Sequence, residues 1–350
     1  MTFKIGQLFM TGFQGTDVSP ALEQLLQQEE LAGVILFRRN IQSLDQLIGL
    51  TTRLRQAAGR PLLLAVDHEG GRVFRMPPPF TQIPPMARIG AAMHADPQLH
   101  LAYDVGRLMG RELAAAGLNV NFAPVLDINT NPDNPIIGDR AFAGNRDLVT
   151  RCSGELIRGL LEGGVIPCGK HFPGHGDTPE DSHKTMPILP HTWDRLRWME
   201  LAPFAAAIQQ GVPLLMTAHV LYGVIDATAP VTLSKRAITG LLREELGFKG
   251  VIVTDDLEMG AIKQCCPPEE AAVRALAAGC DLNLICSSPE VTQRAMLRVN
   301  AAVESGELST ELLSQSALRI RTLATKHAAS AADRACIGCR EHRAVLAPFR

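Results

Sequence analysis

One long loop of the sequence ends in a pair of residues suited to acid–base chemistry. The segment KHFPGHGDTPEDSH runs from Lys170 to His183, and its glycine and proline content predicts an irregular loop. Asp181 and His183 are two residues apart, so in an extended segment both side chains point the same way. The carboxylate can then orient the imidazole and stabilise its charge, as general acid–base catalysis requires. A surface pair without a catalytic role fits the same spacing.

Two adjacent carboxylates follow an apolar run elsewhere in the chain. Asp255 and Asp256 come directly after VIVT at 251–254. Neighbouring residues of a strand point to opposite sides, so at most one of the two is expected to face a site at the strand end. The spacing does not choose between them, and a cap on the following helix is the alternative.

Short apolar runs bounded by Gly, Pro or Asp predict eight buried strands, at 8–13, 33–37, 62–66, 118–122, 165–169, 213–217, 251–254 and 282–286. Apolar residues at helical spacing lie between most of them, at 97–116, 147–162, 193–210 and 235–246. Alternating buried strands and helices indicate a parallel sheet in an α/β protein, and eight units favour a closed (β/α)8 TIM-type barrel. An open doubly wound sheet is the alternative. No strand is followed by a dinucleotide-binding or P-loop motif, so no phosphate cofactor is expected.

The alternation stops near Thr325, where the sequence becomes rich in alanine and then carries arginines and cysteines. We therefore predict a barrel over residues 1–325 and a C-terminal tail or helix over 326–350. Cys336 and Cys339 form a C-x-x-C pattern with His342 beyond, which metal and redox sites can use. The tail offers no second pair of ligands, so this interpretation is the less favoured one.

Polar side chains follow five of the predicted strands, at the end where (β/α)8 barrels place their active sites. They are the Asp67–Arg75 segment VDHEGGRVFR, Asp127, Lys170 with His171, His219, and Asp255 with Asp256. Each alone could be a helix cap or a turn former. Together they indicate a site, because so many desolvated polar groups destabilise a fold unless function retains them.

The composition limits the class of partner. With a net charge of −2 and no long run of Lys or Arg, the chain is not expected to bind nucleic acid or anionic membranes. The N-terminus meets polar and acidic residues early, and no apolar run approaches the ~20 residues of a membrane helix, so a cytoplasmic location is expected. The eight cysteines are scattered and are interpreted as free thiols. The sequence indicates no oligomeric state.

Five segments together resemble the barrel of glycoside hydrolase family 3, specifically the single-domain bacterial β-N-acetylhexosaminidases of the NagZ type. They are VDHEGGRVFR, NFAPVLDI, GDRAF, KHFPGHGDTPEDSH and VTDDLEMGA. The matching blocks extend from about residue 5 to residue 320 in family order. KHFPGHGDT followed by D-S-H is the most specific of them, because family 3 glucosidases generally lack this loop.

The resemblance implies a role for each matching residue. Asp255 is the implied nucleophile, with Asp256 behind it, and His183 assisted by Asp181 is the implied acid/base. Implied contacts to the sugar are Asp67, Arg75, Arg140, Lys170 and His171, with His219 a neighbour. A covalent glycosyl intermediate and retention of configuration follow, without metal or cofactor.

The implied substrate is a saccharide with terminal β-linked N-acetylglucosamine, typically a 1,6-anhydro-muropeptide in peptidoglycan recycling. Two features depart from the family pattern: His68 stands where Gln is common, and the tail after residue 325 has no counterpart.

Three other functions remain open at this stage. A β-N-acetylglucosaminide phosphorylase would use the same residues, because a neutral histidine repels phosphate less than a carboxylate does. A non-catalytic sugar-binding or sensor protein would keep the pocket without turnover. A metal-dependent hydrolase would use His171, His175, His183 and the aspartates as ligands.

Overall fold

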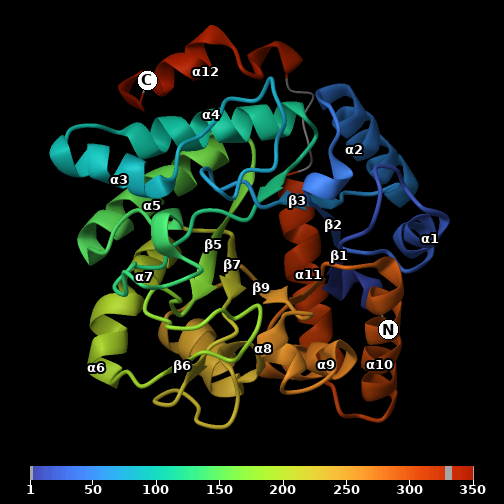
Figure 1. Ribbon diagram of the computed structural model, residues 1–350. Coiled ribbons are helices and arrows are strands. Elements are labelled where there is room, and N and C mark those ends of the chain that lie inside the picture. The colour runs from blue at the N-terminus through green and yellow to red at the C-terminus, as the bar shows by residue number, and fades with distance from the viewer. Residues whose placement is uncertain (1–2, 328–332, 350) are drawn as a thin grey trace.

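The computed structural model describes residues 3–327 and 333–349, and its centre is a closed barrel of eight parallel strands (Figure 1). The order around the barrel is β1-β10-β9-β7-β5-β4-β3-β2, so neighbours in space mostly follow the chain. This confirms the predicted (β/α)8 fold. Each predicted apolar run overlaps one barrel strand, and β5 and β9 extend beyond their runs. The strands are β1 Phe9–Thr11, β2 Gly33–Leu36, β3 Leu63–Val66, β4 Val120–Asn121, β5 Ile166–Phe172, β7 Leu214–Thr217, β9 Val251–Asp256 and β10 Leu282–Ile285.

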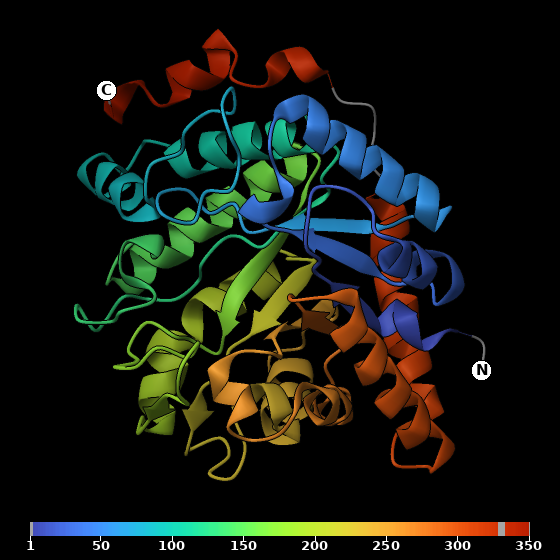
Figure 2. The same ribbon diagram turned by 45° about the vertical axis from the view of Figure 1, so that its right-hand side comes forward.

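Helices surround the barrel, as Figures 1 and 2 show from two directions. The longer ones are α1 Pro20–Gln28, α2 Leu44–Ala58, α3 Met86–Ala95, α4 Leu101–Ala115, α5 Arg146–Glu162, α7 Ala202–Gln209, α9 Pro268–Ala278, α10 Pro289–Glu304 and α11 Thr310–Lys326. Short helices are α6 Trp193–Arg195, α8 Gly260–Lys263 and α12 Arg340–Val345, and short 3-10 turns include η3 Gly138–Arg140 and η7 Arg334–Cys336.

Two predicted helices differ in detail from the expectation. The segment predicted at 193–210 is divided into α6, a π-helical turn at Leu196–Glu200, and α7. Pro203 lies in the first turn of α7, and its missing amide hydrogen cannot continue the preceding ladder. The segment at 235–246 is a π-helix over Arg236–Glu245. A separate pair of short strands, β6 Ile188–Leu189 and β8 Leu221–Tyr222, was not predicted.

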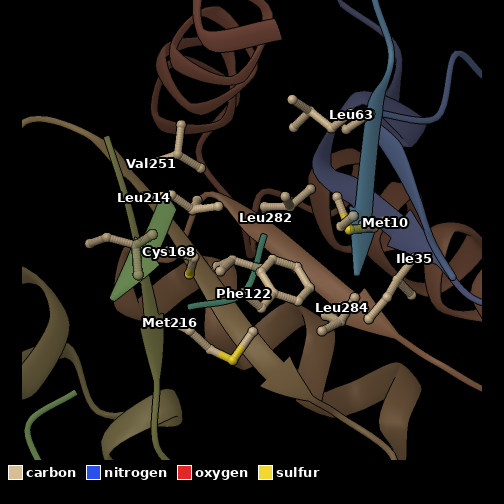
Figure 3. Close-up of a cluster of buried hydrophobic side chains, with 14 of the residues drawn as sticks. Met10, Ile35, Leu63, Phe122, Cys168, Leu214, Met216, Val251, Leu282 and Leu284 are labelled. Atoms are coloured by element: carbon tan, nitrogen blue, oxygen red, sulfur yellow. The ribbon is translucent and has the colours of Figure 1, made fainter. Parts of the chain in front are cut away.

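Apolar side chains from many strands fill the barrel interior (Figure 3). Met10, Phe122, Cys168, Leu214 and Leu282 are all buried. A packed interior of this kind closes the barrel along its axis, so a ligand can enter only at an end. The polar strand ends collect at the carboxyl end of the barrel.

The C-terminal segment lies across α4 on the outside of the barrel, as Figures 1 and 2 agree. In it, Cys336 lies near the carbonyl of Arg111, and Cys339 caps α12 by accepting a hydrogen bond from the His342 amide. All eight cysteines of the chain are free. Among the residues described, no group of three or more His, Cys, Asp and Glu side chains is arranged to hold a metal ion. No helix within the same residues is long and apolar enough to cross a membrane.

Candidate active site

A cavity of about 570 Å³ opens at the carboxyl end of the barrel. Its wall is formed by residues that lie in or after all eight barrel strands, together with the segment around η3. The polar residues that line it include Asp67, Glu69, Arg75, Arg140, Lys170, His171, His175, His183, Asp255, Asp256, Glu258 and Lys263. The structure thus brings together seven of the eight residues predicted for the site, and the eighth, Asp181, holds His183.

Four charged side chains form a closed cluster on one wall of this cavity. The Lys170 ammonium lies 2.6 Å from Asp67 Oδ1 and 2.6 Å from Glu69 Oε1. The Arg140 guanidinium donates two hydrogen bonds of 2.8 Å to the two oxygens of Glu69. Glu69 and Lys170 are almost completely buried, with 1% and 2% of their side chains exposed. Such a cluster fixes the positions of its own members, which suits a set of ligands for sugar hydroxyls.

Opposite charges in the cluster stabilise one another. Burial alone would raise the pKa of Glu69, but Arg140 and Lys170 outweigh it and hold the pKa well below its usual range. Burial alone would lower the pKa of Lys170, whereas Asp67 and Glu69 raise it. Glu69 and Lys170 are therefore both charged at neutral pH.

Next to the cluster, Asp127 contacts the side chain of His171 in β5 and the backbone of His175 beyond it. His171 lies with Nδ1 2.7 Å from Asp127 Oδ2, and the His175 amide donates to the other carboxylate oxygen at 2.8 Å. Burial would raise the pKa of Asp127, but the neighbouring histidines lower it. Because the carboxylate accepts at Nδ1, Nε2 of His171 is left toward the cavity for a ligand.

Asp181 and His183, the predicted acid–base pair, are in contact, and His183 is exposed. His183 Nδ1 lies 2.9 Å from Asp181 Oδ1, and 62% of the His183 side chain is exposed, against 23% for Asp181. The same carboxylate oxygen accepts a hydrogen bond from the His183 amide at 2.8 Å. Burial would raise the pKa of Asp181, but the hydrogen bonds from the amide and the side chain of His183 lower it. The pair leaves Nε2 of His183 free to exchange a proton with a ligand.

Although exposed, the loop that carries His183 is attached at several points. The first part of the loop lies against the backbone of Ile128, where a Cβ atom on Gly176 would lie 1.8 Å from the carbonyl oxygen. His175 Nε2 lies 2.9 Å from Ser182 Oγ, which links the two limbs of the loop. At the tip, the amides of Gly260 and Ala261 at the start of α8 donate to the carbonyls of His183 and Ser182.

Asp255 and Asp256 at the end of β9 have opposite electrostatic environments. Burial would raise the pKa of Asp255, but His219, His171 and the Asp256 amide lower it below its ordinary value. Burial raises the pKa of Asp256 from 3.8 to about 7, with Glu258 and Asp255 adding to the effect. Asp255 is therefore the ionised carboxylate of the pair, as a nucleophile must be, and this distinction was not available from spacing.

The remaining predicted residues lie beside this centre. Arg75 lines the cavity, and its buried Nε has no hydrogen-bond partner among the described residues. His219 lies behind Asp255, with its ring between Thr232 and the carbonyl of Asp256 at 2.8 and 3.0 Å. His68 is buried against Phe74, and burial with the nearby Arg75 lowers its pKa to about 3.

Sequence reasoning missed Glu69 as a site residue. It follows Asp67 by two positions, and both contact the same ammonium group of Lys170. The i, i+2 argument that paired Asp181 with His183 could have identified it. Glu258 was also missed, and it lines the cavity while accepting the amide and hydroxyl of Ser287.

The comparisons with known proteins give this geometry a family. A model described as the glycosyl hydrolase family 3 N-terminal domain matches residues 1–323. The chain belongs to glycoside hydrolase family 3. This confirms the family resemblance of the sequence. The two curated relatives described next are both named β-hexosaminidases.

Two curated relatives show the extent of the similarity. The chain is 40% identical over 282 residues to a β-hexosaminidase of Nitrosospira multiformis, covering 80% of either protein. It is 36% identical over 342 residues to β-hexosaminidase A of Pseudoalteromonas piscicida, covering 91% of this chain but 57% of that protein. The chain thus spans little more than half the length of the second relative.

Two solved structures are similar over most of the chain. A family 3 β-N-acetylglucosaminidase from Paenibacillus sp. FPU-7 has a TM-score of 0.92 at 42% identity, covering 98% of this chain and 66% of that one. NagZ from Neisseria gonorrhoeae, in complex with N-trifluoroacetyl-D-glucosamine, has a TM-score of 0.76 at 33% identity, covering 91% and 98%.

Proposed function

We propose that this chain is a retaining exo-β-N-acetylglucosaminidase. The observation that carries the proposal is the placement of an ionised carboxylate, Asp255, in the same cavity as His183, whose partner is Asp181. A retaining glycosidase needs a nucleophile on one side of the scissile bond and a proton donor on the other. The relatives named β-hexosaminidases and β-N-acetylglucosaminidase support the choice of sugar.

The reaction takes two steps in this proposal. Asp255 attacks the anomeric carbon while His183, protonated at Nε2, gives its proton to the departing oxygen. The carbon–oxygen bond to the aglycone breaks, and a glycosyl ester of Asp255 forms. The now neutral His183 takes a proton from water, which hydrolyses the ester and returns Asp255 to its ionised form. Asp181 stabilises the imidazolium in the first step.

Binding of the sugar is assigned to the buried wall of the cavity. Asp67, Arg140, Lys170 and His171 present charged or polar groups whose positions the cluster and Asp127 fix. Arg75 has a buried Nε without a protein partner among the described residues, which suits a contact with the ligand. Groups held in advance lose little entropy when they bind a neutral sugar.

The proposal extends to the natural substrate and the cellular location. We infer that the aglycone side accepts 1,6-anhydro-muropeptides during peptidoglycan recycling in the cytoplasm. The similarity to NagZ of Neisseria gonorrhoeae supports this choice. The eight free cysteines agree with a reducing compartment.

Hydrolysis of p-nitrophenyl N-acetyl-β-glucosaminide beside the β-glucoside, with wild type and Asp255→Ala, tests the activity. We expect cleavage of the acetamido sugar alone, and its loss in the variant. A phosphate-dependent rate that yields N-acetylglucosamine 1-phosphate would indicate a phosphorylase instead. Binding of N-acetylglucosamine without any cleavage would indicate a sensor, and activity lost to a chelator and restored by zinc would indicate a metal-dependent enzyme.

A further inference from the structure

Glu112 is a buried carboxylate outside the cavity, and it joins three parts of the chain. It lies on α4 with 3% of its side chain exposed. From the segment before α3, it accepts the Thr81 amide at 2.9 Å and the Thr81 hydroxyl at 2.6 Å. From the C-terminal segment, it accepts the Gly338 amide at 2.9 Å, and His342 Nδ1 lies 2.9 Å away. Four donors on one buried carboxylate form a network in which losing one leaves its partners unsatisfied.

The C-terminal segment also packs closely on the chain near Thr81. A Cβ atom on Gly338 would lie 2.0 Å from the carbonyl oxygen of Pro79, so the two backbones are in contact. Leu346 belongs to the same apolar cluster as Ile83, and the Phe349 ring lies under the Arg88 guanidinium at 5.1 Å. Residues 333–349 therefore pack against the outer side of residues 79–88.

The inner side of that segment supports a turn of the active site. The Gly71 amide donates to the Ile83 carbonyl at 3.0 Å. Gly70 and Gly71 have φ angles of +102° and +54°, and a Cβ atom on either would lie within 3 Å of Pro84 or Pro85. This turn lies between Glu69 and Val73, whose backbones are joined by a hydrogen bond of 2.9 Å, so its position sets that of the Glu69 carboxylate.

We propose that Glu112 and His342 are positioning residues for sugar binding. They hold Thr81, the Ile83–Pro85 segment holds the Gly70–Gly71 turn, and the turn holds Glu69 against Arg140 and Lys170. The C-terminal segment thereby acts on substrate affinity without touching the substrate. The inference rests on the proposed function for its kinetic readout and on the fold alone for its structural readout.

This series of contacts from Glu112 to Glu69 reaches only one wall of the cavity. Asp255 on β9 and His183 beside α8 lie outside it. A loosened turn should therefore weaken binding of the sugar in the ground state and the transition state alike, which raises KM and leaves kcat nearly unchanged. A purely structural role would instead lower the amount of active enzyme, and neither KM nor kcat per folded molecule would move.

The experiment compares wild type with His342→Ala, His342→Asn and Glu341→Ala. Asn can place an N–H where Nδ1 lies and should rescue the contact, whereas Glu341 is exposed in the same helix and is the matched control. For His342→Ala we expect a KM for p-nitrophenyl N-acetyl-β-glucosaminide raised about 5-fold or more, with kcat within about twofold. Hydrogen exchange should be faster at the amides of Gly71, Val73 and Thr81 and unchanged in β5 and β9.

Two results would overturn the inference. One is an unchanged KM in an active His342→Ala protein, and the other is unchanged exchange at those amides. If His342→Ala does not fold, Thr81→Val removes the hydroxyl contact from the opposite side and should give the same pattern more weakly. If wild type cleaves no glycoside, the proposed function fails, and the exchange measurement still decides whether the C-terminal segment holds the turn.

Discussion

The two groups of ionisable side chains in the active site are built in opposite ways. The cluster of Asp67, Glu69, Arg140 and Lys170 has its ionic contacts complete without a ligand, and Glu69 is 1% exposed. The Asp181–His183 pair has one contact between its side chains, and the His183 side chain is 62% exposed. The first arrangement suits recognition of a fixed group, and the second suits a proton donor that must meet a leaving group entering from solvent.

The comparison also shows how far each part depends on the rest of the fold. The cluster joins side chains from the segment after β3, from β5 and from the turn η3, which are far apart in sequence. The pair is local, since its two members are separated by a single residue. A change in the cluster is therefore expected to affect stability, whereas a change in the pair is expected to affect mainly turnover.

The largest effect is expected for His183→Ala on substrates with poor leaving groups. Without a proton donor, kcat/KM should fall by about 10²–10⁴-fold for such aglycones and much less for activated ones, because those leave without protonation. The measurement is a series of aryl N-acetyl-β-glucosaminides of graded leaving-group pKa. Unfolding by urea should be almost unchanged. Equal losses across the series would contradict the role of His183.

A second prediction concerns the stability of the buried cluster. Glu69→Ala removes the anion between Arg140 and Lys170, and a buried charge that loses its partner costs about 3–5 kcal/mol. The free energy of unfolding from urea titrations should fall by that amount. The matched control is Glu245→Ala, which breaks an exposed pair with Arg197 and should cost less than about 1 kcal/mol. Similar losses in both variants would remove the distinction between buried and exposed charge.

A third effect, smaller for each pH unit, is expected from the raised pKa of Asp256. The folded state binds a proton on this group between its ordinary pKa of 3.8 and about 7, where the unfolded state has released it. The stability that Asp256 contributes is therefore present below pH 3.8 and is lost as the pH rises to about 7, at up to about 1.4 kcal/mol per pH unit.

Asp256→Asn should remove that dependence and keep the hydrogen bonds that Oδ1 accepts from the amides of Glu258 and Cys286. Urea titrations at about pH 5, 6, 7 and 8 should show the variant gaining stability over wild type up to about pH 7 and no further. A stability difference independent of pH would show that Asp256 is ionised throughout.

The sequence predicted much of the local structure. Eight apolar runs overlap eight barrel strands, and Asp181 and His183 are in contact as expected. The contact arises in a turn at residues 182–184, whereas the spacing argument assumed an extended segment. The contacts among Lys170, Glu69 and Arg140 depend on the closure of the barrel and the course of long loops, which local spacing does not encode. The contact of Glu112 with His342 depends in the same way on the C-terminal segment, which is far from α4 in sequence and packs against it in the fold.

The choice between Asp255 and Asp256 shows the same limit. Two adjacent aspartates are equivalent in a sequence, and only the resemblance to family 3 distinguished them. In the fold, His219 and His171 lie near the first, whereas Glu258 lies near the second. Their opposite pKa shifts arise from neighbours that other strands and loops supply.

The most direct test of the account is to trap the covalent intermediate. Wild-type protein is incubated with an activated 5-fluoro-N-acetyl-β-glucosaminide, digested with protease, and the labelled peptide is sequenced by mass spectrometry. The account predicts one glycosyl ester, on Asp255, with no label on the Asp255→Ala protein. A label on Asp256 or another residue, or turnover of the reagent with inversion and no label, would contradict it.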